Sequence, residues 1–296
     1  MTASHPQYMW CNGSLRAWND GTVHAMNYSM QYGVSAFEGI RLYDTEKGPA
    51  IFRLKEHIDR LFYSMAALGM VWRHISHHQI KTALIDLAKA NEMSEGYFRP
   101  IAYLEEGVGL PATDFMPHLD IALLPPLQNK KTSYHVCFST YRRINPQTTN
   151  VEAKISGNYV NSHLAFLEAR EQGYDDAILC DHEGYVAEAC AANIFWVHDN
   201  VCYTTPRGAI LNGITRKTIM EIIRVIEEDI KPQKLLQADE IFLCGTAYEI
   251  KPVVEIGCTL IGNGTPGPMT RRIAQLYQDI VRGRVDRCHH WLTYVE

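Results

Sequence analysis

The sequence predicts a two-domain protein of the α+β class. Its 296 residues exceed one ordinary domain, and roughly 150 residues per domain gives two. Apolar residues recur at helical spacing in some segments and form short strand-like runs in others. In the second half these helices and strands do not alternate regularly, which argues against a doubly wound sheet and for a mixed α and β arrangement.

The first half is expected to open with paired strands, because Asn12-Gly13 separates two strand-like runs and favours a hairpin turn. Helices over 54–68 and 80–91 and strands over 97–104 and 119–124 follow. Pro100 is expected to restrict the strand that contains it to a sheet edge or a bulge, since proline lacks the backbone N–H.

The domain boundary is expected near residues 125–131, which combine rigid and polar residues. This divides the chain into a small α/β domain (1–126), a linker (127–133) and a second domain (134–296). In the second domain we predict strands at 134–140, 177–180, 194–197 and 241–244, helices at 160–172 and 269–281, and a loop at 262–268. A further helix should start near Thr215, with Ile219, Ile222, Ile223 and Ile226 as its apolar stripe.

The composition is that of an ordinary soluble globular protein, with 46% hydrophobic and 21% charged residues. Lys and Arg total 28 against 33 Asp and Glu, and no basic run is present, so nucleic acid is a poor partner. The longest apolar run, 121–127, is too short to cross a bilayer, and residues 1–7 have no secretion signal. We therefore expect a cytoplasmic protein without a membrane partner.

The eight cysteines are scattered, form no Cys-x-x-Cys pair and mostly have apolar neighbours, which predicts buried thiols in a reducing compartment. His74, His77 and His78 could bring two imidazoles together at helical spacing. No carboxylate or cysteine with ligand spacing accompanies them, so we interpret them as a solvated helix start and expect no metal site.

Several common catalytic motifs are missing from the sequence: the P-loop, Gly-x-Ser-x-Gly, His-Glu-x-x-His, and Gly-x-Gly-x-x-Gly after a strand. Lys154 is a candidate because it lies between an extended stretch and the Gly157-Asn158 turn that opens the next helix. This position places its amine at the end of a strand beside a helix start. Most lysines are simply exposed, so Lys154 alone is weak evidence.

Glu188 lies among small and apolar residues, where an unpaired carboxylate would be costly. Its partner is either a local amide or arginine, in a structural role, or a protonated ring nitrogen, in a functional one. Two turns could bind an anion: residues 211–216, with Thr215 the expected N-cap of a helix, and residues 244–247, with the Thr246 hydroxyl. Most such turns are only caps, so neither decides the function alone.

Taken in order, these segments resemble the class IV family of pyridoxal-phosphate enzymes, of the D-amino-acid-aminotransferase-like fold type IV, and most closely its branched-chain-amino-acid aminotransferases. The resemblance covers nearly the whole chain and includes residues 32–41, 52–61, 97–100, 154–162, 184–195, 211–216, 245–253 and 291–295. One such motif would be weak evidence, whereas their succession in order is specific. It implies a two-domain fold whose large domain, 134–296, binds the cofactor.

The resemblance implies that Lys154 bonds to the aldehyde of pyridoxal 5'-phosphate and moves the Cα proton of the substrate. Glu188 would pair with the ring nitrogen and keep the ring protonated. The remaining implied cofactor contacts are Tyr159 at the phenolic oxygen, Leu211 against the ring, and Arg60, Ile214, Thr215 and Thr246 at the phosphate.

The same resemblance implies that the amides of Thr246 and Ala247 take the substrate carboxylate, and that the substrate is surrounded by Tyr32, Phe37, Tyr97 and Arg99. The implied reaction transfers an amino group between a branched-chain L-amino acid and 2-oxoglutarate, as in branched-chain amino acid biosynthesis. Large apolar walls suit leucine, isoleucine and valine, and a polar spot must admit glutamate. The family also implies an active site between domains, completed in a homodimer or a larger assembly of dimers.

Two departures from the family pattern bear on substrate preference. Pro126 runs directly into residues 127–130, where relatives commonly carry a longer segment with Gly-x-Tyr-Leu-Gly, so an aromatic pocket wall is expected to be missing. After Glu188 the chain reads Ala-Cys-Ala-Ala-Asn, where the family favours Gly, a small residue, Gly, Glu and Asn. Residues 99–106 also depart from the usual apolar continuation.

Three alternatives stay open from the sequence. Two are enzymes of the same fold, a transaminase for D-amino acids or primary amines and an aminodeoxychorismate-lyase-like enzyme, and the third is a cofactor-free binding or scaffold protein. The Tyr-Gly-x-Ser-x-Phe-Glu-Gly-Ile-Arg and Tyr-x-Arg-Pro motifs favour the branched-chain branch, and intact Lys154 and Glu188 favour an enzyme.

Overall fold

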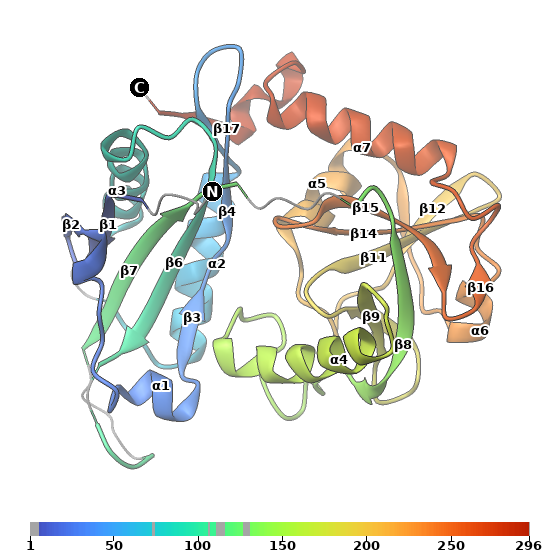
Figure 1. Cartoon of the computed structure of the whole chain (residues 1–296), viewed down its shortest axis with the longest axis horizontal. Coiled ribbons are helices and arrows are strands. Elements are labelled where there is room, and N and C mark those ends of the chain that lie inside the picture. The colour runs from blue at the N-terminus through green and yellow to red at the C-terminus, as the bar shows by residue number, and fades with distance from the viewer. Residues whose placement is uncertain (1–5, 73–74, 106, 111–115, 127–130, 296) are drawn as a thin grey trace. The chain divides into compact units, whose positions relative to one another are not determined.

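The structure is a computed structural model that describes residues 6–72, 75–105, 107–110, 116–126 and 131–295. The chain forms two compact units, each with its own sheet (Figure 1). The described residues up to 126, together with 153–157 and 279–295, form the first unit. Residues 131–152 and 158–278 form the second unit.

This division differs from the expected one in two segments. Residues 153–157 and 279–295 lie with the first unit, although the sequence suggested one domain over 134–296. The reason is strand pairing, since Ile155 bridges to Ala36, and β17 (Leu292–Tyr294) pairs with β5 (Ala50–Phe52). The expected linker 127–133 lies mostly outside the described residues.

Eight described strands form the sheet of the first unit, in the order β17-β5-β4-β6-β7-β1-β2, with β3 paired to β6. Their remaining bounds are β1 Tyr8–Cys11, β2 Ser14–Ala17, β3 Ser35–Phe37, β4 Ile40–Tyr43, β6 Gly96–Leu104 and β7 Pro117–Leu124. Asn12 and Gly13 turn the chain between β1 and β2 with φ angles of 46° and 103°, which confirms the predicted hairpin.

The expectation that Pro100 lies at a sheet edge or a bulge is wrong, because β6 has partners on both sides. On one side Pro100 faces Ile121 of β7. On the other side the partner changes from β3, which ends at Phe37, to β4, which starts at Ile40. Pro100 lies at this change of partner, where its missing N–H interrupts no regular ladder, and its carbonyl accepts a hydrogen bond from Glu38 N at 2.9 Å.

Helices α2 (Leu54–Ala67) and α3 (His77–Ala90) supply the core of the first unit. Their buried side chains belong to one apolar cluster with strand residues such as Phe98 and Ile121. The short helix α1 (Tyr28–Tyr32) and two 3-10 turns, η1 (Trp18–Asp20) and η3 (Asp286–Trp291), complete the unit. Both long helices were predicted, because their apolar residues recur every three or four positions.

His77 and His78 are the first two residues of α3 and are exposed, as expected. Ser76 caps α3 and exchanges hydrogen bonds with Gln79 in a capping box. His77 lies 3.2 Å from Asp59 and stacks on a neighbouring phenylalanine ring. His74 lies outside the described residues.

Nine described strands form the sheet of the second unit, in the order β10-β9-β8-β15-β14-β11-β12-β13, with β16 paired to β15. Their bounds are β8 Tyr134–Arg142, β9 Asp176–Cys180, β10 Val186–Ala189, β11 Asn193–His198, β12 Val201–Thr204, β13 Val225–Glu227, β14 Glu240–Gly245, β15 Glu249–Ile256 and β16 Thr259–Leu260. The helices of the second unit are α4 (Tyr159–Glu171), α5 (Ile214–Ile222), α6 (Pro232–Leu235) and most of α7 (Pro268–Val281), whose last three residues belong to the first unit. The 3-10 turn η2 (Ser156–Asn158) has residues in both units. All four strands predicted for this half are present.

The helix expected from Thr215 through Ile226 is shorter than predicted. α5 ends at Ile222, Ile223 is extended, and Ile226 lies in β13. The β-branched run at 222–226 favours a strand, and β13 gains a parallel partner in β12. The isoleucine spacing therefore reflects both a helix and the strand that follows it.

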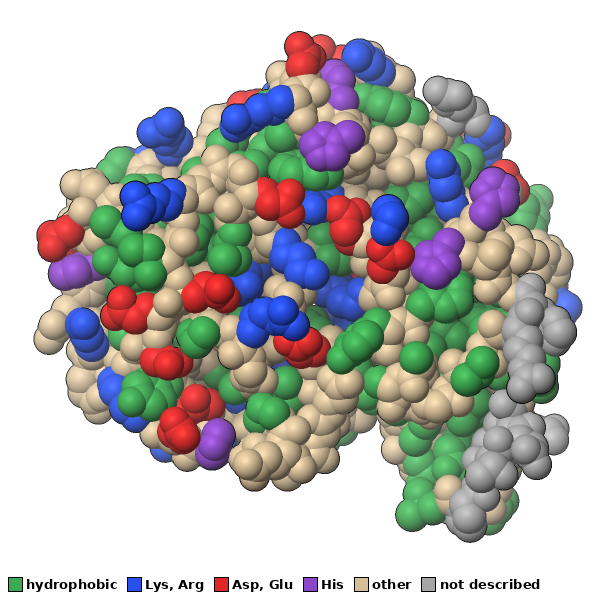
Figure 2. Space-filling model, turned by 180° about the vertical axis from the view of Figure 1, so that it is seen from behind, with side chains coloured by type: hydrophobic (Ala, Val, Ile, Leu, Met, Phe, Trp, Pro, Cys, Tyr) green, Lys and Arg blue, Asp and Glu red, His purple; other side chains and the backbone are tan. Residues whose placement is uncertain are grey.

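All eight cysteines are free, and seven are buried, as predicted. Cys258 is the exception, because it lies exposed in the turn between β15 and β16. No helix within the described ranges is both long and apolar enough to cross a membrane. On the face shown in Figure 2, acidic and basic side chains are interspersed.

Candidate active site

Lys154 lies in a short segment of the first unit, residues 153–157, that backbone hydrogen bonds hold in place. Its carbonyl accepts a hydrogen bond from Phe37 N at 3.1 Å, and its amide donates to Ser64 Oγ at 2.8 Å. The next residue, Ile155, bridges to Ala36. The lysine is therefore fixed between β3 and α2, beside the turn that opens α4.

Two glycines allow this segment to approach α1 closely. Gly157 N donates to Gly33 O at 3.1 Å, and a Cβ added to Gly33 would lie 3.2 Å from Gly157 Cα. Gly33 also ends α1 with a left-handed φ of 68°, which favours glycine. A side chain at either position would crowd the segment that carries Lys154.

The Lys154 amine lies over an aromatic ring. Its Nζ is 4.6 Å from the centroid of Phe37, and the lysine is half-buried. The face of an aromatic ring attracts a cation, and the ring also shields the amine from water on that side. The structure thus brings Lys154 together with a residue predicted to surround the substrate.

Phe37, Tyr97 and Arg99 form an aromatic wall that contains one cation. The Arg99 guanidinium lies 4.9 Å from the Phe37 ring centroid and 5.1 Å from that of Tyr97. Arg99 Nη2 also donates to Tyr97 Oη at 3.4 Å. Gly39 makes room for this wall, because an added Cβ would lie 1.7 Å from Tyr97 Oη.

The fourth predicted substrate residue, Tyr32, has other partners. It ends α1 with an exposed side chain, and its Oη accepts a hydrogen bond from Gly109 N at 3.2 Å. Its ring centroid lies 4.7 Å from that of Tyr28. The structure therefore brings together three of the four residues predicted to surround the substrate, and Tyr32 lies with the 107–110 segment.

Arg60, the predicted phosphate ligand, is oriented by a buried carboxylate. Arg60 Nε and Nη2 donate to Glu38 at 2.6 and 2.9 Å, and His57 Nδ1 lies 2.8 Å from the same carboxylate. Burial alone raises the pKa of Glu38, but the charge of Arg60 and the hydrogen bonds outweigh it and hold the pKa far below its ordinary value. Burial also lowers the pKa of His57, so a neutral imidazole donates its Nδ1 proton to Glu38.

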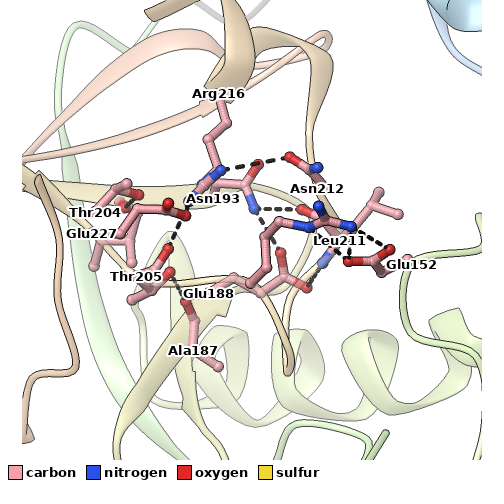
Figure 3. A network of polar contacts seen from close by, with 12 residues as sticks. Glu152, Ala187, Glu188, Asn193, Thr204, Thr205, Leu211, Asn212, Arg216 and Glu227 are labelled. Carbon is pink, nitrogen blue, oxygen red and sulfur yellow. Dashed lines mark hydrogen bonds and ion pairs between the residues drawn. The ribbon is translucent and has the colours of Figure 1, made fainter. Parts of the chain in front are cut away.

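Glu188, on β10, is buried in the second unit at the centre of a hydrogen-bond network (Figure 3). Its Oε1 accepts from Arg143 Nε at 2.7 Å and from Leu211 N at 3.3 Å, and its Oε2 accepts from Asn193 Nδ2 at 2.9 Å. An arginine and an amide, the structural partners that the sequence left open, are therefore both present. Charged and neutral N–H donors of this kind stabilise an ionised carboxylate.

The N-cap of α5 is Gly213, so the expectation of Thr215 as N-cap is wrong. Gly213 has an extended backbone, and a Cβ there would lie 2.2 Å from Asn193 Oδ1. Ile214 and Thr215 are the first two helical residues, and amides at these positions have no partner within the helix. Asn193 contacts both this turn and Glu188, so the two candidate sites of the second unit are adjacent.

A buried arginine supports the same turn from within the second unit (Figure 3). Arg216 donates to Thr205 O at 2.9 Å, forms an ion pair with Glu227, and lies 3.5 Å from Asn212 Oδ1. Contacts of Arg216 with a backbone carbonyl and two side chains thus fix the start of α5.

Thr246 and Ala247 form the turn between β14 and β15. β11 pairs with β14 up to Asn193 and Cys244, which places this turn beside the 190–192 turn that follows Glu188. Tyr159 is the first residue of α4 and is half-buried. The predicted residues of the second unit are therefore Tyr159, Glu188, Leu211, Ile214, Thr215, Thr246 and Ala247, and those of the first are Tyr32, Phe37, Arg60, Tyr97, Arg99 and Lys154.

Sequence reasoning missed Glu38, His57, Arg143 and Asn193. A signal existed for Glu38, since an acidic residue between Phe37 and the apolar strand β4 needs a buried partner just as Glu188 does. Arg143 had no such signal, because it lies 45 residues from Glu188 in a polar segment.

The donor set fits pyridoxal phosphate, which presents an aldehyde, a basic ring nitrogen and a phosphate. The chain offers an amine at Lys154, a buried carboxylate at Glu188, and amides at the N-terminus of α5. Among the described residues, the buried Nη1 of Arg143 has no hydrogen-bond partner, so the network around Glu188 has a donor left for a polar ligand.

Comparison with known proteins agrees with the predicted resemblance. The family model for amino-transferase class IV matches residues 35–256. A branched-chain-amino-acid aminotransferase of Pseudomonas aeruginosa is 36% identical, over 97% of this chain and 97% of that protein. The T.th. branched-chain amino acid aminotransferase with pyridoxamine 5'-phosphate has a TM-score of 0.94 at 34% identity, and the match covers 100% of both chains.

A second structure of the T.th. enzyme, complexed with N-(5'-phosphopyridoxyl)-L-glutamate, has a TM-score of 0.93 at 34% identity and covers 98% of this chain and 99% of that chain. The groups named in these structures confirm pyridoxal phosphate as the cofactor. The predicted fold type is confirmed as well. The chain belongs to the class IV family of aminotransferases.

Proposed function

We propose that this aminotransferase moves an amino group from a branched-chain L-amino acid to 2-oxoglutarate, giving the branched 2-oxo acid and L-glutamate. The observation that carries the proposal is the position of Lys154, whose amine lies against an aromatic wall with one cation, Arg99. The names of the relatives, branched-chain-amino-acid aminotransferases, support the donor class.

Lys154 is the proposed catalytic residue. When bound, pyridoxal phosphate supplies an aldehyde that bonds to an amine and a ring that accepts electrons from the substrate's Cα. Lys154 Nζ would hold the cofactor through its aldehyde and, when not bonded to it, would accept the Cα proton of the substrate and donate it to the cofactor. The backbone bonds of Lys154 to Phe37 and Ser64 limit its motion to the side chain.

Glu188 is the proposed partner of the ring nitrogen. Arg143 and Asn193 fix its carboxylate and favour its charged form, so Glu188 can hold a proton on the ring nitrogen by ion pairing. Leu211, whose amide donates to Glu188, would place its side chain against the ring, and Tyr159 would contact the phenolic oxygen.

The phosphate is proposed to bind the amides of Ile214 and Thr215, with Thr246 and Arg60 as further ligands. The start of α5 combines free amides with the positive end of the helix dipole. Glu38 holds Arg60 through Nε and Nη2, so the arginine presents a fixed rather than a mobile charge.

The substrate is proposed to lie against Phe37, Tyr97 and Tyr32, with its α-carboxylate on the amides of Thr246 and Ala247. The rings suit a branched apolar side chain, and Arg99 suits the second carboxylate of glutamate or 2-oxoglutarate. A glutamate adduct of the cofactor is named for the T.th. relative. One wall with an embedded cation can therefore serve both substrates.

The proposal is tested by replacing the lysine. Lys154→Ala should abolish transamination and the visible absorption of the bound cofactor, because it removes the amine that holds the aldehyde and moves the proton. The fold should persist, as far-ultraviolet circular dichroism would show. Lys81→Ala, at an exposed position on α3, is the matched control and should stay active and coloured. An active, yellow Lys154→Ala protein would sink the assignment.

The assembly and location are proposed from the family alone. We propose a cytoplasmic homodimer, or a larger assembly of dimers, and light scattering of the purified protein would measure its mass. The transaminase for D-amino acids or primary amines and the aminodeoxychorismate-lyase-like enzyme are the alternatives that a donor panel excludes or supports.

A further inference from the structure

A buried carboxyl in the second unit lies between the turn that carries Thr246 and Ala247 and the turn that follows Glu188. Asp176, the first residue of β9, has no solvent-exposed surface. Its Oδ1 accepts from Ala177 N at 2.8 Å, and its Oδ2 accepts from Tyr248 Oη at 2.8 Å. Cys190 lies beside this carboxyl, and its Sγ donates to the carbonyl oxygen of the next residue, Ala177, at 3.7 Å.

Tyr248 and Cys190, the neighbours of Asp176, lie in turns that adjoin proposed site residues. Tyr248 directly follows Thr246 and Ala247 in the turn between β14 and β15. Cys190 follows Glu188 by two residues, in the turn between β10 and β11. Asp176 therefore binds the first turn through the hydroxyl of Tyr248, and the Asp176–Ala177 backbone lies beside Cys190 of the second turn.

The two turns also touch each other directly. A Cβ added to Gly245 would lie 3.4 Å from Ala191 O, so the strand before Thr246 packs against the turn after Glu188. Tyr248 is further fixed by its ring, which packs edge-on against Tyr134 at 6.0 Å between centroids. The Thr246–Ala247 turn therefore has a rigid anchor at its third residue.

A hydrogen bond that only stabilised the fold would not require a buried carboxyl at position 176. Within the described part of the chain, the hydrogen-bond donors to Asp176 are all neutral, and burial raises the pKa of both Asp176 and Tyr248. A buried acid without a basic partner is costly, so the contribution of Asp176 is the geometry that it imposes on its donors.

We propose that Asp176 and Tyr248 are positioning residues that fix the Thr246–Ala247 turn relative to Glu188, so that its amides receive the anionic groups of cofactor and substrate. This inference rests on the function proposed above and adds the residues that orient its anion-binding turn. Neither residue touches the reacting atoms, so removing the contact should weaken anion binding more than it slows catalysis.

The test is Tyr248→Phe, which removes one hydroxyl and leaves the ring. We expect the Kd of the cofactor-free protein for pyridoxal phosphate, and the KM for the amino donor, each to rise about tenfold, as the loss of one hydrogen bond to a charged group would produce. The Kd for pyridoxal, which lacks the phosphate, and kcat should each change less than about threefold. Hydrogen exchange should also quicken at the 246–249 amides.

The matched control is Tyr203→Phe, in the same unit, where the ring stacks on Trp196 and the tyrosine lies in β12, away from both turns. It should leave both Kd values, KM, kcat and the exchange of the 246–249 amides unchanged. If Tyr248→Phe lowers thermal stability but leaves the phosphate-dependent Kd and KM as in the control, the positioning role is refuted and the contact is only structural. Asp176→Asn, which keeps the shape of the side chain, should reproduce the KM and Kd effects of Tyr248→Phe.

The failure of the proposed function would look different. In that case the wild-type protein would not become coloured with pyridoxal phosphate. Lys154→Ala would be as active as the wild-type protein. A coloured wild type together with unchanged binding in Tyr248→Phe overturns this inference alone.

Discussion

Glu188 and Glu38 are buried carboxylates, each held by an arginine and by a second side-chain donor. Glu188 binds Arg143 and Asn193, and Glu38 binds Arg60 and His57. Their proposed roles differ, since Glu188 acts on the cofactor ring and Glu38 orients a phosphate ligand. Separate substitutions can therefore distinguish charge at the ring from support of a neighbouring side chain.

Glu188→Gln should lower kcat by about two orders of magnitude or more while the cofactor still binds, because a neutral amide no longer keeps the ring nitrogen protonated. Single-turnover absorbance measurements would separate this chemical step from binding. Glu183→Gln, at an exposed position in the turn between β9 and β10 of the same unit, is the matched control and should keep its activity. Full activity in Glu188→Gln would make Glu188 a structural carboxylate.

Glu38→Gln should destabilise the protein by about 3 kcal/mol at neutral pH, because it removes a fully buried carboxylate that pairs with the half-buried Arg60. The lowered pKa of Glu38 means that its ionised form stabilises the fold at pH values above the ordinary 4.5. As pH falls below that value, this contribution is lost progressively, so the gap between the two proteins should narrow.

Urea unfolding at several pH values measures that gap. Glu95→Gln is the control, since Glu95 pairs with Arg282 at a more exposed position and should cost under about 1 kcal/mol. A constant difference between wild type and Glu38→Gln from about pH 7 to about pH 3 would show that the charge of Glu38 does not stabilise the fold.

At the scale of elements, the start of α5 shows how a turn becomes a candidate anion site. Gly213 leaves space for Asn193, and Asn193 in turn holds Glu188. The buried Arg216 fixes the same turn from the other side. The free amides of the helix are thus fixed in place by side chains rather than by a flexible loop.

This arrangement predicts tighter binding of pyridoxal phosphate than of pyridoxal, by about tenfold or more, since phosphate contacts are charge-assisted. Arg60→Ala should reduce the difference, and so should Gly213→Ala, whose Cβ would meet Asn193 Oδ1 at 2.2 Å. Equilibrium dialysis of the cofactor-free protein with both compounds measures it. Arg224→Ala, at a position beyond the end of α5, should keep the full difference. Equal affinity of wild type for the two compounds would contradict a phosphate site here.

At the scale of the whole molecule, the sequence predicted what local pattern determines. The hairpin at Asn12-Gly13 and helices α2, α3, α4 and α7 follow from turn residues and apolar spacing. The errors came from distant pairing: β4 takes over from β3 beside Pro100, and β12 converts Ile226 from helix to strand. The contacts of Arg143 with Glu188 and of Tyr248 with Asp176 span 45 and 72 residues, and no local pattern marks them.

Substrate preference is also a property of the whole molecule, and the short 127–130 segment bears on it. If an aromatic wall is missing there, kcat/KM should depend less on the size of the donor's side chain than it does in a closed apolar site. In a closed site each buried methylene contributes ~0.8 kcal/mol. We therefore expect good rates with leucine, isoleucine and valine, a blunted preference over alanine, and measurable side activity with methionine and phenylalanine.

The most direct test of the proposed function is kcat/KM for L-leucine, L-isoleucine, L-valine, L-methionine, L-phenylalanine, L-alanine and D-alanine with 2-oxoglutarate as acceptor. Branched-chain L-amino acids should be the best donors, with the larger apolar donors next. A steep preference confined to the three branched donors would refute the open pocket but keep the donor class. D-alanine as the best donor, or no transfer from any branched-chain donor, would contradict the branched-chain assignment itself.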